Sequence, residues 1–275
     1  MRAVQNQQED LLPLYNKIKD TKHMITFISP AKTMDFESKA PSFSSKPIFQ
    51  SESESLVNRC KALTLEQIKG LMSVSDKIAR TNYTRFQMFY NNTTPEKQAI
   101  YTYNGDVYNG IQTNSFNTQD IKYAQSFIRI LSGLYGILRP MDLIKPYRLE
   151  MGTRLEVNQQ KGLYQFWRNK ITSHIIKELE PHKEKIIINL ASNEYSSVID
   201  RNNIPCHIID IVFKETKNNE TKIVPIKSKR ARGVMTNFII KEKITNPESL
   251  KAFEENGYRF NKSLSSSREY VFVGE

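Results

Sequence analysis

The sequence predicts a mixed α/β fold: a single large domain with a mixed sheet, surrounding helices and a helix-hairpin-helix element. Short apolar runs typical of buried strands are interspersed with longer amphipathic segments typical of helices. No internal repeat and no clean linker divides the chain. Apolar residues make up 39% and aromatic residues 10% of the 275 residues, which supports a core and excludes a disordered chain. We expect residues 1–23 to be an N-terminal extension and residues 24–275 to be the domain.

The first strand and helices follow from local patterns. Residues 24–28 are apolar and rich in strand formers, which predicts a buried strand. Thr64 with Gln67 makes a capping box before an apolar run, which predicts the start of a helix. Ser73 with Asp76 repeats that signal for the next helix.

Residues 117–133 show a clear amphipathic pattern. Thr118 is placed to cap a helix, apolar residues recur on one face, and Gly133 closes the pattern. The remaining elements are predicted from similar signals: helices that begin at Thr94–Pro95 and cover residues 163–179 and 229–244, and strands at residues 185–192, 206–214, 221–229, 257–260 and 269–273.

The overall composition indicates which kind of partner and which cellular compartment to expect. The formal net charge is +11 and the isoelectric point about 9.4, so a polyanionic partner such as nucleic acid or a nucleotide is expected. The two cysteines fit a reducing compartment, and the four histidines show no ligand spacing typical of zinc or haem. No apolar run reaches the roughly 20 residues of a membrane span, and residues 1–23 lack a signal-peptide core. We therefore expect a cytoplasmic protein with no metal and no cofactor.

One stretch combines glycine, proline and positive charge: LSGLYGILRPMDLIKPYRLEMG, residues 131–152. A helix, then SGLYG, then a short helix RPMDLI is the layout of a helix-hairpin-helix over Leu131–Leu143. In that motif Gly133 and Gly136 let the backbone approach DNA phosphates, which sets affinity without reading sequence. The alternative is an ordinary hairpin of two helices with glycine at the cap. The accompanying positive charge comes from Arg139, Lys145, Arg148 and Arg154.

Polar residues also gather where the predicted strands end. Ser29 and Lys32 follow the first strand, and the carboxyl ends of strands are where α/β folds usually bind ligands. The pair matches the Ser-x-x-Lys of some acyl-transfer enzymes without their other motifs, and a capped turn with a surface lysine is the plainer interpretation. In residues 147–151 the alternation places Arg148 and Glu150 on one face. A substrate pocket or a structural ion pair is then expected from Ser29, Lys32, Arg148, Glu150, Asn189 and Glu194.

The segment KSKRAR, residues 227–232, holds four basic residues and no acidic one at a strand-to-helix junction. The free N–H groups and the dipole at a helix start favour anions, so basic side chains there are unfavourable for the helix itself. An anionic partner is therefore expected at Lys229, Arg230 and Arg232, and a solvated basic face is the alternative.

Seven segments resemble, in order, the signature blocks of the YaaA family, the bacterial peroxide-stress resistance proteins: FISPAKTMDF, NGDVYNGI, LSGLYGILRPMDLIKPYRLEMGTRL, LYQFWRNKIT, INLASNEY, RARGVMTNFII and GYRF. The resemblance covers residues 24–275, and members usually begin near Met24. It implies a cytoplasmic protein induced by hydrogen peroxide that lowers free intracellular iron. It also implies a mixed α/β fold with a helix-hairpin-helix and a basic cleft that binds duplex DNA. Carried over by position, the cleft uses Lys32, Arg139, Arg148, Lys229, Arg230 and Arg232.

Two functions stay open at this point. The first is a DNA-binding stress protein that grips the backbone of duplex DNA through the hairpin and the basic cleft. The second is an enzyme that acts on a nucleotide or on damaged nucleic acid in the pocket at the strand ends. Direct iron sequestration is a weaker third, because no residue spacing indicates an iron site.

Overall fold

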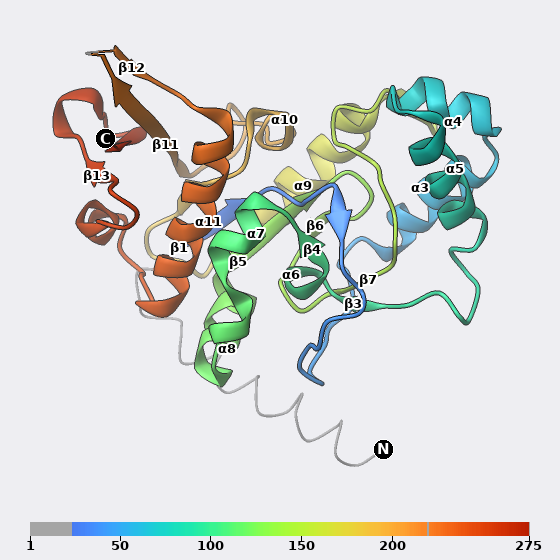
Figure 1. Ribbon diagram of the computed structural model, residues 1–275, viewed down its shortest axis with the longest axis horizontal. Helices are drawn as coiled ribbons and strands as arrows, with labels where there is room; N and C mark the ends of the chain where they lie inside the picture. The colour runs from blue at the N-terminus through green and yellow to red at the C-terminus, as the bar shows by residue number, and fades with distance from the viewer. Residues whose placement is uncertain (1–23, 219, 275) are drawn as a thin grey trace.

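The computed structural model describes residues 24–218 and 220–274, and the predicted extension at residues 1–23 lies outside them. An eight-stranded mixed sheet forms the centre of the fold (Figure 1). Its strands are β1 (Met24–Ile28), β5 (Ile128–Ser132), β6 (Gly136–Leu138), β10 (Ile186–Asn189), β11 (His207–Lys217), β12 (Glu220–Lys222), β13 (Arg259–Phe260) and β14 (Glu269–Gly274). The predicted mixed α/β class is therefore confirmed.

The strand order places a change of direction next to β1. The sheet runs β13-β14-β11-β10-β1-β5-β6, and the five strands from β14 to β5 are parallel to one another. From β1 the chain moves to β5 on one side and later returns to β10 on the other side. This is a topological switch point, and in open α/β sheets ligands bind in the crevice outside the carboxyl ends of the strands there.

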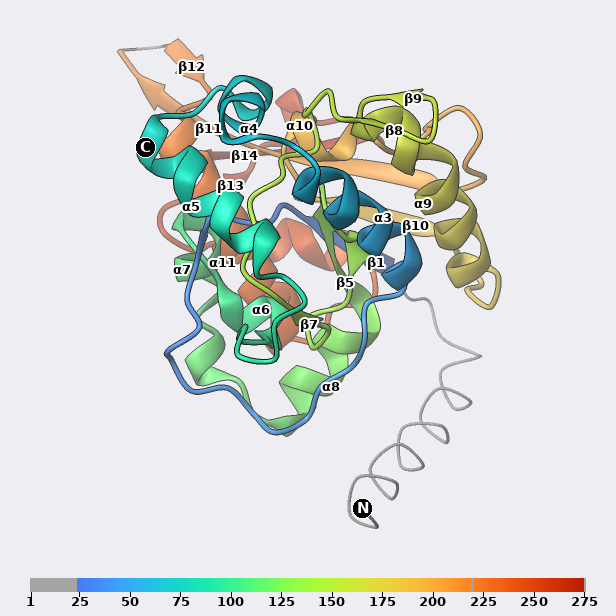
Figure 2. The same cartoon turned by 90° about the vertical axis from the view of Figure 1, so that its right-hand side faces the viewer.

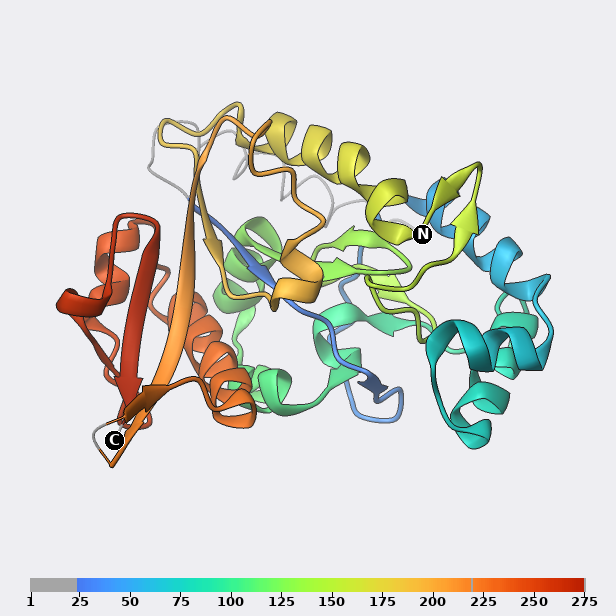
Figure 3. The ribbon, with the colours of Figure 1, turned by 90° about the horizontal axis from the view of Figure 1, so that it is seen from above.

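Helices cover both faces of the sheet. In Figure 2, α7 and α11 lie to one side of the central strands and α9 to the other. A cluster made by α3, α4 and α5 lies at the end of the molecule remote from β11 and β14 (Figures 1 and 3). The helices are α3 (Gln50–Lys61), α4 (Leu65–Met72), α5 (Asp76–Gln87), α6 (Ala99–Thr102), α7 (Asp106–Ile111), α8 (Thr118–Phe127), α9 (Leu163–Leu179), α10 (Asn193–Ser196) and α11 (Pro225–Lys241), with short 3-10 turns at Thr113–Ser115, Pro247–Ala252 and Lys262–Leu264.

Three two-stranded ribbons complete the fold: β2 (Thr33–Met34) with β4 (Tyr103–Asn104), β3 (Lys97–Gln98) with β7 (Leu143–Ile144), and β8 (Glu156–Val157) with β9 (Gln160–Lys161). The β2–β4 ribbon joins the loop after β1 to the segment that leads into α7. Helix α7 in turn packs against α11 with almost no space between the backbones. A Cβ on Gly233 would lie 1.9 Å from the carbonyl oxygen of Val107, so only glycine permits this crossing.

The segment expected to be a helix-hairpin-helix is a β-hairpin. Helix α8 ends at Phe127, and Ile128–Ser132 continues as β5, which pairs with β6 across a tight turn. The two isoleucines of β5 are β-branched and completely buried between β1 and β6, so packing in the sheet overrides the helical pattern. No second helix follows in the described residues 139–144. The helix-hairpin-helix prediction for Leu131–Leu143 is therefore wrong.

The two glycines of that segment face the protein interior. A Cβ on Gly133 would lie 2.1 Å from the carbonyl oxygen of Leu149, and one on Gly136 would lie 2.7 Å from the Trp167 ring. Gly136 also has a φ of +70°, which glycine adopts without strain. These glycines allow the hairpin to pack against its neighbours, and both are buried away from any surface that DNA could contact.

Several smaller predictions have definite outcomes. The strand at residues 24–28 and the helix at residues 163–179 are confirmed to the residue. The capping box of Thr64 and Gln67 is present.

Three local predictions are corrected by the structure. Ser73 ends α4 and Ser75 is the N-cap of α5, which corrects the predicted helix start. No helix begins at residues 94–95. The predicted strand at residues 221–229 is only the short β12, because the proline at position 225 begins α11.

Candidate ligand pocket at the carboxyl edge of the sheet

The loops that follow β1 and β10 are joined at the switch point. The backbone N–H of Leu190 donates to the carbonyl oxygen of Phe27 at 2.9 Å, which continues the pairing of the two strands. Beyond it, the backbone N–H of Ser192 donates to Oγ of Ser29 at 2.8 Å, and the two hydroxyl groups lie 3.3 Å apart. Ser29 therefore fastens the two loops together at the carboxyl edge of the sheet.

Lys32, Arg148 and Glu150 meet beside these loops. The Nζ atom of Lys32 lies 3.2 Å from Oε1 of Glu150, and Nη2 of Arg148 donates to the same oxygen at 2.6 Å. The side chains of Arg148 and Glu150 are only 18% and 25% exposed, whereas that of Lys32 is 60% exposed. The Nε atom of Arg148 is buried and has no hydrogen-bond partner among the described residues. One carboxylate oxygen thus balances two cations.

The orientation of this pair follows from the alternation of residues 147–150. Tyr147 and Leu149 are buried, and Arg148 and Glu150 point the other way, as the sequence predicts. The hydroxyl group of Tyr147 lies 2.6 Å from that of Tyr103 and 2.6 Å from that of Ser132. Burial raises the pKa of Tyr147 to about 12, so this phenol stays neutral at physiological pH. A buried anchor on one side of the segment therefore fixes the charged pair on the other.

Arg148 and Glu150 line a pocket of about 240 Å³ between the sheet edge and the α3–α5 cluster, whereas Ser29 and Lys32 are not among its lining residues. Its lining residues are Leu71, Met72, Ser73, Arg148, Glu150, Gly152, Thr153 and Glu194. Glu194 lies in the first turn of α10, and its Oε1 accepts a hydrogen bond from the backbone N–H of Gly152 at 3.3 Å. The hydroxyl group of Tyr164 also donates a hydrogen bond to the carbonyl oxygen of Glu194 at 2.7 Å.

Two contributions from the helix cluster were missed by sequence reasoning. The end of α4 supplies Leu71, Met72 and Ser73 to the pocket wall. Arg85 of α5 is half-buried, and burial together with the nearby charge of Arg148 lowers the pKa of Arg85. Two arginines that repel each other beside a pocket favour an anionic ligand. The sequence held one signal for Arg85: it lies close to Asn82 and Phe86, which α5 buries.

Asn189, the remaining residue of the predicted pocket, belongs to a neighbouring network. Its Nδ2 atom donates to Oδ1 of Asp210 at 2.6 Å, and its Oδ1 accepts from the backbone N–H of Ala191 at 3.1 Å. Asp210 also accepts two hydrogen bonds of 2.7 Å from Arg201. Asn189 therefore shapes the loop that carries Glu194 and does not line the pocket itself.

Comparison with known proteins finds similar sequences over nearly the whole chain. A family model described as peroxide stress protein YaaA matches residues 24–264. This chain belongs to the peroxide stress protein YaaA family. A UPF0246 protein of Aliivibrio fischeri (strain ES114) is 44% identical over 255 residues, which cover 92% of this chain and 98% of that protein. A UPF0246 protein of Psychromonas ingrahamii is 44% identical over 256 residues, which cover 90% of this chain and 98% of that protein.

The cationic residues expected to bind DNA in this YaaA-family chain differ in their availability. Lys229 and Arg230 are exposed on the first turns of α11 and form no ion pair within the described residues. Arg232 is half-buried, its Nε atom is buried without a partner there, and burial lowers its pKa despite the nearby charge of Asp210. Lys145 is held by the carbonyl oxygen of Phe89 at 2.9 Å.

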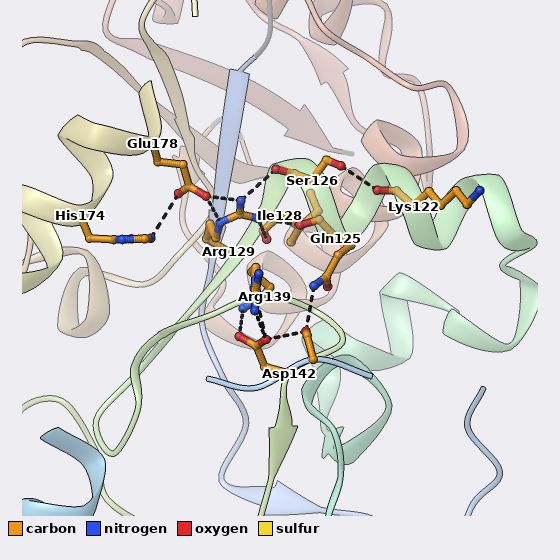
Figure 4. Close-up of polar contacts among 10 residues, drawn as sticks. Lys122, Gln125, Ser126, Ile128, Arg129, Arg139, Asp142, His174 and Glu178 are labelled. Carbon is orange, nitrogen blue, oxygen red and sulfur yellow. Dashed lines mark hydrogen bonds and ion pairs between the residues drawn. The ribbon is translucent and has the colours of Figure 1, made fainter. Parts of the chain in front are cut away.

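Arg139 is also engaged by the protein itself (Figure 4). Its guanidinium donates to Oδ1 of the buried Asp142 at 3.0 Å and to the carbonyl oxygen of Lys46 at 3.0 Å. The backbone N–H of Arg139 reaches Oδ2 of Asp142 at 2.8 Å. Arg139 and Asp142 therefore close the turn after β6 and give it a structural purpose.

Two further observations describe the YaaA-family fold. Within residues 24–218 and 220–274, no three histidine, cysteine or acidic side chains are grouped as a metal ion requires. No helix in that part of the chain is long and apolar enough to cross a bilayer.

Proposed function

We propose that this YaaA-family protein acts under peroxide stress by binding a nucleotide or damaged nucleic acid in the carboxyl-edge pocket and catalysing a reaction on it. The observation that carries the proposal is the buried Nε of Arg148, which lies beside Glu150 and Lys32 and has no hydrogen-bond partner within residues 24–218 and 220–274. A buried guanidinium with an unused donor is well suited to a phosphate or carboxylate oxygen. The switch-point location is independent support, because it comes from strand order alone.

The pocket chemistry favours a ligand that carries both an anion and hydroxyl groups. Arg148, Lys32 and Arg85 supply positive charge, whereas Glu150 and Glu194 supply carboxylates. A carboxylate at a switch-point site accepts hydrogen bonds from ribose hydroxyls or takes a proton as a general base. The volume of about 240 Å³ lies below the range usual for whole small molecules, so the pocket accommodates only the reacting part of a larger ligand.

Binding to the wild-type protein and to two arginine variants tests the proposal. We expect ATP, AMP or pyrophosphate to bind in isothermal titration calorimetry, and Arg148→Met to weaken binding at least about tenfold. Arg154→Met is the matched control, because Arg154 is nearby and exposed and does not line the pocket. Equal binding by wild type and Arg148→Met, or no binding of any of the three ligands, contradicts the proposal.

A second candidate function is binding of duplex DNA through its phosphate backbone. The specific support is the exposed residues Lys229 and Arg230 near the start of α11, which form no ion pair with the part of the chain that the structure describes, in a chain with net charge +11. Backbone binding of this kind weakens steeply with salt, with a log–log slope of about −0.9 for each phosphate contacted.

Fluorescence anisotropy at several salt concentrations tests this candidate. The double variant Lys229→Ala with Arg230→Ala should weaken binding to all DNA sequences about equally and reduce the slope by about two. The charge-matched control is Lys262→Ala with Arg268→Ala, which removes two exposed cations elsewhere. Equal losses in both double variants indicate a non-specific charge effect and reject a site on α11.

We further propose that protection from free iron is an indirect consequence of the pocket chemistry. The family name refers to peroxide stress, and the pocket offers groups that suit a phosphorylated organic ligand. Electron paramagnetic resonance of chelated iron in peroxide-treated cells tests this route. Cells that carry Arg148→Met should then show as much free iron as cells that lack the protein. Normal iron levels in those cells reject the indirect route.

A further inference from the structure

A second cleft, separate from the pocket, opens beside the β2–β4 ribbon and α7. Its volume of about 450 Å³ falls within the range usual for sites that hold a small molecule. Its lining residues are Asp35, Ser38, Ile100, Tyr101, Tyr103, Asn104, Tyr108, Asn109, Gln112, Thr113, Asn114 and Ser115. We call it the amide cleft, because four side-chain carboxamides surround it and no lysine or arginine lines it.

The carboxamides of the amide cleft are free to bind a ligand. No hydrogen bond joins the side chain of Asn104, Asn109, Gln112 or Asn114 to another described residue, and the same holds for the hydroxyl group of Tyr101. Each carboxamide offers both donors and an acceptor. The cleft therefore matches an uncharged ligand that presents donors and acceptors in turn.

The floor of the amide cleft is aromatic and rigidly held. Tyr103 is fixed by its 2.6 Å contact with the hydroxyl group of Tyr147, and Tyr108 donates to the carbonyl oxygen of Ser29 at 3.1 Å. Their rings pack 5.4 Å apart. Tyr101 is half-buried at the edge of this floor. An aromatic floor below polar amides favours a flat ring as the ligand.

The rim of the cleft is held in a conformation that costs energy. Gln112 ends α7 with a φ of 54°, in the left-handed region that residues other than glycine rarely adopt. Such strain persists where the surrounding structure enforces it, and it is frequent at ligand sites. On the opposite wall, Oδ1 of Asp35 accepts from the backbone N–H groups of Glu37 and Ser38 at 2.8 and 3.1 Å. These bonds fix the position of the Asp35 carboxylate at the cleft.

We propose that the amide cleft binds a single unstacked nucleobase. Tyr101 provides a stacking face, and the carboxamides of Asn109, Gln112 and Asn114 hydrogen-bond the base edge. Asparagine and glutamine pair with base edges through two hydrogen bonds, and enzymes that act on nucleic acid hold extruded bases between aromatic side chains. The identification of the ring as a nucleobase rests on the proposed function, whereas the existence of the site rests on the cleft alone.

One short segment of chain connects the surroundings of the pocket to the amide cleft. Lys32, which contacts Glu150 of the pocket, precedes β2, and Asp35 of the amide cleft follows it. Three residues span at most roughly 10 Å even when fully extended.

Nucleosides that lack phosphate test the amide cleft independently of the pocket. We expect at least one of adenosine, guanosine, cytidine and uridine to bind the full-length protein in saturation-transfer NMR and calorimetry. Tyr101→Leu and the double variant Asn109→Ala with Asn114→Ala should each weaken that binding at least about tenfold. Gln119→Ala is the matched control, because it removes an exposed carboxamide of α8 that does not line the cleft.

The outcomes separate this proposal from the proposed function. Arg148→Met should retain nucleoside binding while losing phosphate-dependent affinity, and circular dichroism with a melting curve verifies that each variant is folded. The proposal is overturned if no nucleoside binds at 10 mM. It is also overturned if folded cleft variants bind as wild type does, or if ribose or glucose binds as well as the nucleosides.

Discussion

The ammonium group of Lys32 lies 3.2 Å from the Glu150 oxygen that also accepts a hydrogen bond from Arg148. This relationship joins the loop after the central strand β1 to the segment after β7. A single carboxylate oxygen cannot fully satisfy an ammonium and a guanidinium, which together offer more donors than it accepts. Under the proposed function, an incoming phosphate would supply the missing acceptors, and the cluster would exchange partners when the ligand binds.

Removing the negative charge of Glu150 tests this exchange. Glu150→Gln leaves Lys32 and Arg148 without their shared carboxylate, so we expect pyrophosphate affinity to rise by about tenfold. If the carboxylate takes part in a reaction, the same variant fails to restore survival to peroxide-treated cells that lack the protein. Calorimetry and survival counts measure the two effects. Glu156→Gln, an exposed change on β8, should match wild type in both.

Unchanged pyrophosphate affinity in Glu150→Gln would show that Glu150 does not compete with the ligand for the two cations. Full survival with that variant would limit Glu150 to orienting Arg148 and exclude it as a general base.

The buried hairpin glycines make a prediction about stability. Gly133→Ala places a Cβ against the carbonyl oxygen of Leu149, so we expect a loss of about 3 kcal/mol or more in the free energy of unfolding. Urea denaturation measures it. Gly70→Ala is the control, because nothing lies within 4 Å of its Cβ position and alanine favours a helix. A Gly133→Ala protein as stable as wild type would contradict the tight packing of the hairpin against the carbonyl oxygen of Leu149.

Asp120 links α8 to α11, and its lowered pKa predicts that the protein loses stability in acid. Burial alone would raise its pKa, but hydrogen bonds from Lys241, Lys243 and the backbone of Asn117 lower it to about 2 from 3.8. A lowered carboxyl pKa contributes stability that is present above the unfolded value and is lost as the pH falls toward 2. Asp120→Asn should therefore cost about 2 kcal/mol at pH 7, because it weakens hydrogen bonds to charged groups.

Denaturant unfolding between pH 2 and pH 7 measures this effect. The difference between wild type and Asp120→Asn should shrink as the pH falls below about 4. A difference that stays constant over this range contradicts the role assigned to the ionised carboxylate.

The buried pair of Arg129 and Glu178 ties β5 to α9 (Figure 4). Their side chains are 5% and 12% exposed, and Arg129 also donates to the carbonyl oxygens of Gln125, Ser126 and Ile128. Burial alone would raise the pKa of Glu178, but Arg129 leaves it lowered. Glu178→Gln should cost about 3–5 kcal/mol, because it leaves a buried charge uncompensated.

The melting temperature and urea midpoint of Glu178→Gln measure that cost. Glu180→Gln serves as the control. Glu180 is exposed just after the end of α9, so this change should leave stability unchanged. A Glu178→Gln protein as stable as wild type would show that the guanidinium is satisfied by the backbone carbonyls alone.

The sequence by itself determined the elements whose local pattern and tertiary environment agree. Residues 24–28 and 163–179 have the composition and period of a buried strand and an amphipathic helix, and they form those structures. The alternation at residues 147–150 likewise placed Arg148 and Glu150 on the same side of the segment, because alternate side chains of an extended backbone point to the same side. The family was also readable, because its signature blocks occur in order along the chain.

Only the tertiary structure decided the rest. Residues 128–132 fit a helix or a strand by local pattern, and burial between β1 and β6 selected the strand. That choice turned a predicted DNA-binding hairpin into part of the core. The place of Arg85 and of the α4 wall at the pocket depends on segments far apart in the chain, and so does the approach of Asp35 to residues 100–115 in the amide cleft. Local sequence patterns carry no signal for such contacts, because distance along the chain does not specify proximity in the fold.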